Sequence, residues 1–83
     1  MEIGVDAKVE RLIRSEGRDY RVCTSCTGPA LVPTTVKRPK ESDIKIPIGK
    51  NILYISAVQA RYIRKVTIDM LYRDADGSCP VFY

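Results

Sequence analysis

Histidine is absent from the 83 residues of the chain. This absence excludes Ser-His-Asp and Cys-His catalytic arrangements and every zinc site that needs an imidazole ligand. General acid–base catalysis would fall to carboxylates, lysine, tyrosine or cysteine, and no grouping of these residues along the sequence indicates an active site. The five glycines are scattered and form no phosphate-binding loop. We therefore expect a protein that is not an enzyme.

Long apolar runs are also missing. None approaches the roughly 20 residues of a membrane-spanning helix, and the first residues lack the basic and then apolar pattern of a signal peptide. Three cysteines are an odd number, which argues against a secreted disulfide framework. We expect a cytoplasmic protein with reduced thiols and no membrane partner.

The length predicts a single domain over residues 1–83, close to the lower limit for independent folding. A core of this size leaves a small stability margin, so a bound metal or a second copy of the chain could add stability. A homodimer is therefore one expectation. Hydrophobic residues make up 45% of the chain, which is ordinary for a globular protein.

Two patterns compete in the N-terminal part of the chain. A loose alternation over residues 8–23, with Gly17 in a polar centre, predicts a β-hairpin whose turn needs a positive φ. The alternative is a helix over residues 6–15, with Asp6 as its N-cap and one apolar face. That face would contain Val9, Leu12 and Ile13. We favour the hairpin.

The middle of the chain gives the clearest strand pattern. Isoleucines alternate with Lys45 and Pro47 over residues 44–48, a Gly-Lys-Asn turn follows, and an apolar strand returns to Ile55. Pro47 cannot donate a ladder hydrogen bond, which indicates an edge strand. The polar residues 34–43 before this hairpin predict a surface loop, and we expect it to be the most mobile segment.

Further elements complete the prediction. Residues 30–32 are a short apolar run that predicts a brief strand, and Ser56 could cap a short helix toward Ile63. Residues 65–72 alternate with period two, which predicts a strand, and a turn at 74–77 and a last short strand at 79–83 follow. The expected fold is α+β, a small antiparallel β-sheet or partly closed barrel with one short helix. An all-β small barrel is the alternative.

The segment VCTSCTGP places Cys23 and Cys26 in a C-x-x-C arrangement. This spacing fits half of a zinc knuckle, but the only further cysteine is Cys79, so a four-thiolate site would need a symmetric dimer. A thiol–disulfide redox pair is a third possibility, although Pro29 would fall inside the helix that such a pair requires. We favour cysteines packed as small residues around a turn with no cofactor, and keep zinc bound by Cys23, Cys26 and Cys79 as the alternative.

Basic residues outnumber acidic ones and give a net charge of +4. Two basic clusters are candidates for nucleic-acid binding by contact with phosphates. They consist of Lys37, Arg38 and Lys40, and of Arg61, Tyr62, Arg64 and Lys65. Five further cations precede them: Lys8, Arg11, Arg14, Arg18 and Arg21. A stacking surface for bases could come from Tyr20, Tyr54 or Tyr62.

The stretch from CTSCTGPALVP through KESDIKIPIGKNILYISAVQARYI resembles small uncharacterised proteins of methanogenic archaea, over about half of the chain. The resemblance implies no activity and assigns no residue a role. We therefore expect a small basic binding module without catalytic activity, whose partner is RNA or a protein of a ribonucleoprotein. A zinc-stabilised structural domain is the alternative, followed by a thiol redox protein.

Overall fold

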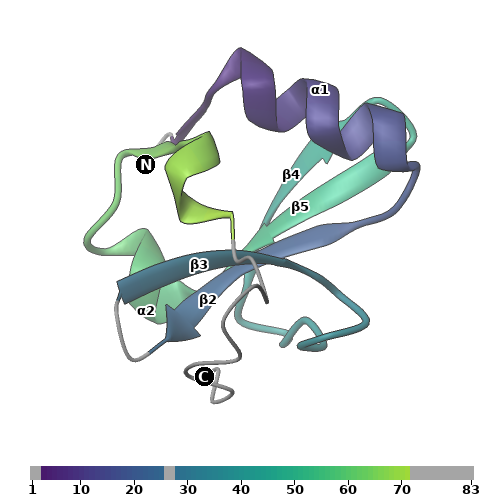
Figure 1. Ribbon diagram of the computed structural model, residues 1–83. Coiled ribbons are helices and arrows are strands. Elements are labelled where there is room, and N and C mark those ends of the chain that lie inside the picture. Colours follow the sequence, from purple (N-terminus) through teal and green to yellow (C-terminus); the bar gives the residue numbers. More distant parts are fainter. Residues whose placement is uncertain (1–2, 26–27, 72–83) are drawn as a thin grey trace.

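The structure, a computed structural model, describes residues 3–25 and 28–71. Four strands form its main sheet, in the order β3-β2-β5-β4 (Figure 1). They are β2 (Tyr20–Ser25), β3 (Gly28–Pro33), β4 (Ile44–Ile48) and β5 (Asn51–Ile55). Strands β2 and β3 form one antiparallel hairpin and β4 and β5 another, and the two hairpins join through a parallel pairing of β2 with β5.

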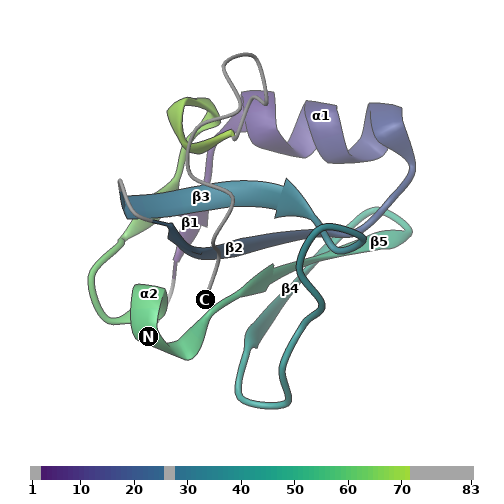
Figure 2. The same cartoon turned by 60° about the horizontal axis from the view of Figure 1, so that its bottom comes forward.

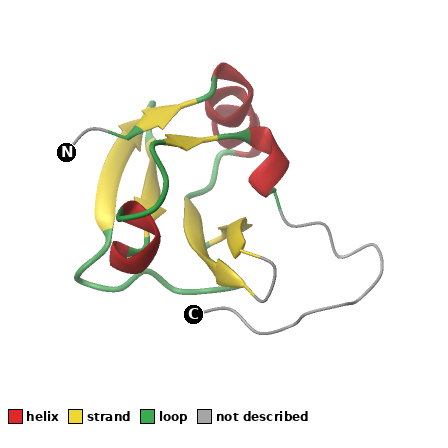
Figure 3. Cartoon of the chain, turned by 90° about the vertical axis from the view of Figure 1, so that its left-hand side faces the viewer, coloured by secondary structure: helices red, strands yellow, loops and turns green. Residues whose placement is uncertain are grey.

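A second, two-stranded sheet pairs the short strands β1 (Gly4–Val5) and β6 (Lys65–Val66) in parallel. These strands lie side by side near the N-terminus (Figure 3). The helices are α1 (Ala7–Glu16) and α2 (Ala57–Ala60), and the 3₁₀ turn η1 covers Ile68–Met70. The predicted α+β class is confirmed and the all-β alternative is wrong. The sheet is mixed and not antiparallel, because β2 pairs with β5 in parallel, and the described residues form two helices where one short helix was expected. In the described part of the chain the sheets do not close into a barrel.

Helix α1 replaces the hairpin that we favoured for residues 8–23, so that prediction is wrong and its helical alternative is correct. Asp6 caps the helix, because its carboxylate accepts the N–H of Lys8 at 3.4 Å. Val9 and Ile13 lie one turn apart and are fully buried. Gly17 does have the positive φ that we expected, 66°, but it ends the helix and donates its N–H to the carbonyl of Ile13.

The hairpin of residues 44–55 is confirmed, and β4 is an edge strand as Pro47 indicated. The short strand over residues 30–32 is also confirmed, inside β3. Helix α2 begins after Ser56 as predicted but ends at Ala60, and the Ser56 side chain makes no capping bond.

The strand expected over residues 65–72 is confirmed at residues 65–66 and is wrong over residues 67–71, and residue 72 lies outside the described residues. Its partner β1 is two residues long, because helix α1 starts at Ala7 and the last ladder bond runs from Asp6 N–H to the Val66 carbonyl. The chain then turns into η1, whose apolar side chains pack against the core, and Leu71 after it forms a single parallel bridge with Leu31 of β3. The turn expected at 74–77 and the strand at 79–83 lie outside the described residues.

The main core lies between the sheet and α1 (Figure 1). Alternate residues of β2 and β5 point into it, among them Tyr20, Val22, Leu53 and Ile55. Helix α1 contributes Val9 and Ile13, which are fully buried. The opposite face of β2 is also buried, and there Cys23 packs with Ala30 and Val32 of β3. Strand β2 is therefore covered on both faces, which makes it the centre of the domain.

Among the described residues no helix has the length and apolar character needed to cross a membrane.

We predict that Gly17→Ala destabilises the protein by about 1 kcal/mol, because a Cβ is disfavoured at a φ of 66°. Urea unfolding measures this change. Gly4→Ala is the matched control: a Cβ at Gly4 would meet its neighbours at ordinary distances of 3.7 and 3.8 Å. The control should cost less than about 0.5 kcal/mol. Equal losses in the two variants would contradict the assigned end of α1.

Candidate nucleic-acid interface

The segment Arg61–Lys65, between α2 and β6, exposes four of its five side chains. Tyr62 is 78% exposed, more than any other large apolar side chain described. Arg61, Arg64 and Lys65 are exposed around it. We call this set the Tyr62 patch: Arg61, Tyr62, Arg64 and Lys65. The structure therefore brings together every predicted residue of this cluster on one surface segment.

Helix α2 holds the first end of the patch against the main sheet. The buried Gln59 donates its side-chain N–H to Thr24 Oγ1 of β2 at 2.9 Å, and Ser56 N–H donates to the carbonyl of Val22 at 2.9 Å. The backbone N–H groups of Tyr62 and Ile63 both donate to the Gln59 carbonyl, at 2.9 and 3.0 Å. The turn that carries Tyr62 is thus bonded to a residue that is itself fixed to β2.

Strand β6 holds the second end. Gly4 N–H donates to the Arg64 carbonyl at 2.9 Å, and Lys65 pairs with Gly4 in the small sheet. Between the two ends Ile63 is partly buried and packs against the main core. The backbone under the patch is therefore attached at three points, while the charged and aromatic side chains remain in solvent.

The cations of the Tyr62 patch have no carboxylate partner within the described ranges, where ion pairs involve Arg14, Arg18 and Arg21 instead. Of the three tyrosines considered for stacking, Tyr20 is 4% exposed and packs in the core, and its burial raises the pKa of its phenol. Tyr54 is half-buried in β5. Tyr62 alone of these three offers an open ring face.

The second predicted cluster lies elsewhere. Lys37, Arg38 and Lys40 belong to the loop between β3 and β4, which stands on the right in Figures 1 and 2, whereas α2 and β6 stand on the left. The structure therefore does not merge the two basic clusters into one patch. The loop has no regular secondary structure, as predicted, and its expected mobility stays a prediction.

One buried ion pair attaches this loop to the main sheet. Arg21 of β2, which the sequence suggested as a surface cation, is 1% exposed. Its Nε and Nη2 atoms donate to the two carboxylate oxygens of Asp43 at 2.6 and 3.0 Å, and the Asp43 side chain is fully buried. The Lys40 backbone N–H donates to the same carboxylate at 3.1 Å. Such two-pronged contacts fix both partners in one geometry.

These contacts also set the charge state of the pair. Burial by itself would raise the pKa of the Asp43 carboxyl, but the bonds from Arg21 and from Lys40 N–H outweigh it and hold the pKa below its usual value. The hydrogen bond to Asp43 likewise raises the pKa of Arg21. The pair is therefore fully ionised at neutral pH. A partial signal for it exists in the sequence, since Arg21 lies between Tyr20 and Val22, and an arginine buried among apolar residues needs a partner.

The structure describes one of the three candidate metal ligands, Cys23. Its side chain is 0% exposed and its thiol donates to the Ala30 carbonyl at 3.6 Å. Burial raises the pKa of this thiol, which disfavours the thiolate that a metal would need. No three potential metal ligands gather within the described residues. Cys26 and Cys79 lie outside the described residues, and the zinc site and the shared site of a homodimer stay predictions.

Comparisons with models of protein families, with curated proteins and with solved structures find no match for this chain. The resemblance to proteins of methanogenic archaea therefore stays a sequence-based expectation.

We predict that Asp43→Asn destabilises the fold by about 3–5 kcal/mol, because it leaves the Arg21 guanidinium buried beside a neutral group. Chemical unfolding measures the loss. Glu16→Gln is the matched control, since it removes the exposed partner of Arg18 and should cost no more than about 1 kcal/mol. Similar losses in the two variants would contradict the proposed anchoring of the loop.

The pH dependence of unfolding provides a second measurement of the same pair. The folded-state pKa of Asp43 is lower than its unfolded value of about 3.9. Its contribution to stability is therefore complete above that value and is lost as the pH falls through the folded-state pKa. Asp43→Asn should remove this part of the acid sensitivity.

Proposed function

We propose that the protein is a small RNA-binding module that contacts single-stranded RNA through the Tyr62 patch. The observation that carries the proposal is an aromatic ring 78% exposed among three exposed cations. Single-stranded RNA offers unstacked bases to aromatic rings and phosphates to arginine and lysine. The patch supplies both kinds of contact within five consecutive residues.

The hydrogen-bonded backbone on both sides of Tyr62 supports this proposal. A tyrosine that served packing would be buried, as Tyr20 is in the core, whereas Tyr62 contributes little to the core and leaves its ring in water. The hydrogen bonds of Gln59 and Gly4 hold the backbone on both sides of it. A ring presented on a fixed backbone loses less conformational entropy when it binds than one on a free loop.

The charge balance at the patch favours RNA over a protein partner. Three cations and no paired carboxylate within residues 3–25 and 28–71 give a uniformly positive surface segment, which suits the uniform negative charge of a phosphate backbone. We also propose that the module acts without catalysis and in the cytoplasm, where the free thiol of Cys23 would stay reduced.

An oligouridine of about eight nucleotides, titrated by fluorescence anisotropy at several salt concentrations, tests the proposal. Tyr62→Ala should weaken binding by about tenfold through the lost base stacking. Arg61→Gln with Arg64→Gln should lower the dependence of log K on log salt by about 1.4, which is two phosphate contacts at about 0.7 each.

The loop cluster provides the matched control. Lys37→Gln with Arg38→Gln removes the same charge from a different part of the surface, and it should leave the salt dependence close to that of the unchanged protein. Loss of binding in the loop variant and retention in the Tyr62 patch variants would overturn the proposal. Binding to an acidic protein without binding to RNA would overturn it as well.

A further inference from the structure

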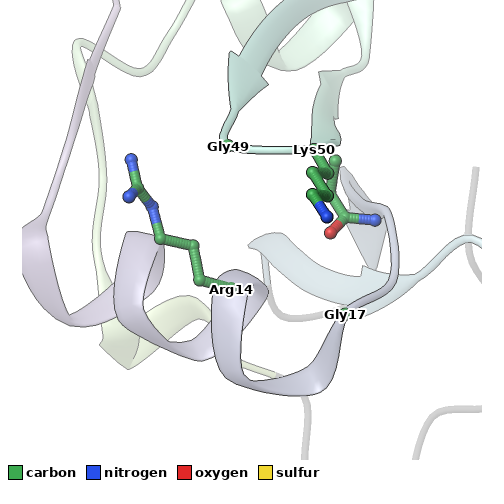
Figure 4. A pocket seen from close by; sticks show the side chains of 5 residues that line it. Arg14, Gly17, Gly49 and Lys50 are labelled. Atoms are coloured by element: carbon green, nitrogen blue, oxygen red, sulfur yellow. The ribbon is translucent and has the colours of Figure 1, made fainter.

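A hollow lies away from the Tyr62 patch, between the end of α1 and the turn that joins β4 to β5 (Figure 4). Its volume is about 380 Å³, within the range of roughly 300–1,000 Å³ that small-molecule sites occupy. It is lined by Arg14, Gly17, Gly49, Lys50 and Asn51. The RNA proposal makes no use of this region.

Two glycines with positive φ angles line the hollow. Gly17 and Gly49 have φ angles of 66° and 61°, a conformation that side chains other than glycine rarely adopt. A Cβ at Gly49 would lie 3.7 Å from Cγ of Arg14 and 3.8 Å from its Nε. The arginine side chain therefore lies within van der Waals range of the Gly49 backbone.

Two cations from different elements face this space. Figure 4 shows Arg14 rising from α1 on one side and Lys50 extending from the β4–β5 turn on the other. Arg14 has a weak, exposed contact with Glu10 at 3.8 Å. Lys50 forms no ion pair within the described part of the chain, so the positive charge of the hollow is incompletely balanced.

The carboxylate of Asp19 is engaged by two hydrogen-bond donors of β5. Asp19 accepts the Asn51 side-chain N–H at 3.1 Å and the Ile52 backbone N–H at 2.9 Å, and it does not line the hollow. The N–H groups of Gly49 and Lys50 make no turn or loop hydrogen bond to another described backbone group.

We propose that this hollow binds the phosphate group of a small phosphate-bearing molecule. The Arg14 guanidinium would donate to two phosphate oxygens, and the Lys50 ammonium would add a second positive charge. This inference is independent of RNA binding at the Tyr62 patch.

Amide chemical shifts during a titration with inorganic phosphate test the proposal, with sodium chloride adjusted to keep the ionic strength constant. We expect saturable shifts confined to residues 14–17 and 49–51. The same titration is repeated with a nucleoside monophosphate. Equal affinity for the two probes would assign recognition to the phosphate alone, and tighter binding of the nucleotide would extend the ligand to the nucleoside.

Arg14→Gln with Lys50→Gln should weaken phosphate binding by about tenfold or more. Lys45→Gln is the matched control, because it removes an exposed cation from β4 that does not line the hollow, and it should leave the affinity unchanged. Arg61→Gln with Arg64→Gln should also leave it unchanged, which separates this site from the Tyr62 patch. Shifts that do not saturate, that chloride reproduces, or that persist in the Arg14 and Lys50 variant would overturn the proposal.

Discussion

The buried ion pair of Arg21 with Asp43 is the constraint on which the arrangement of the molecule most depends. It joins the central strand β2 to the last residue of a ten-residue polar segment, 34–43, at distances of 2.6 and 3.0 Å. An unpaired guanidinium in this position would be costly, so β2 can be covered on its second face only when Asp43 is in place. The loop is thereby held over the face that contains Cys23.

The same strand also fixes the surface that we assign to RNA. On its core side, Val22 and Thr24 accept hydrogen bonds from the backbone of Ser56 and the side chain of Gln59. These bonds position α2, and the turn after α2 carries Tyr62. Strand β2 therefore holds the β3–β4 loop on one of its faces, and it also holds α2 and the segment that carries the Tyr62 patch. The side chains of the Tyr62 patch can stay exposed, because the backbone that carries them is held by β2 and by the small β1–β6 sheet.

Local patterns predicted the hairpin of residues 44–55 correctly and the helix α1 wrongly, and contacts between distant residues decided how the elements pair. The hairpin of residues 44–55 was predictable because its alternating apolar residues and its Gly-Lys-Asn turn are both visible in the sequence. The start of α1 fits a helix or a strand equally well, and the caps at Asp6 and Gly17 make the difference. The parallel pairing of β2 with β5 and the burial of Arg21 depend on partners more than 20 residues away. The composition of the Tyr62 patch was predictable, but its separation from the loop cluster was not.

Mapping the amide chemical shifts of the protein as a short single-stranded RNA is added tests the central claim most directly. We expect the largest changes on residues 58–65, increasing with RNA until they saturate, while residues 37–40 change little. A response centred on the β3–β4 loop, or none at an RNA concentration that saturates comparable single-strand binders, would contradict the assignment of function to the Tyr62 patch.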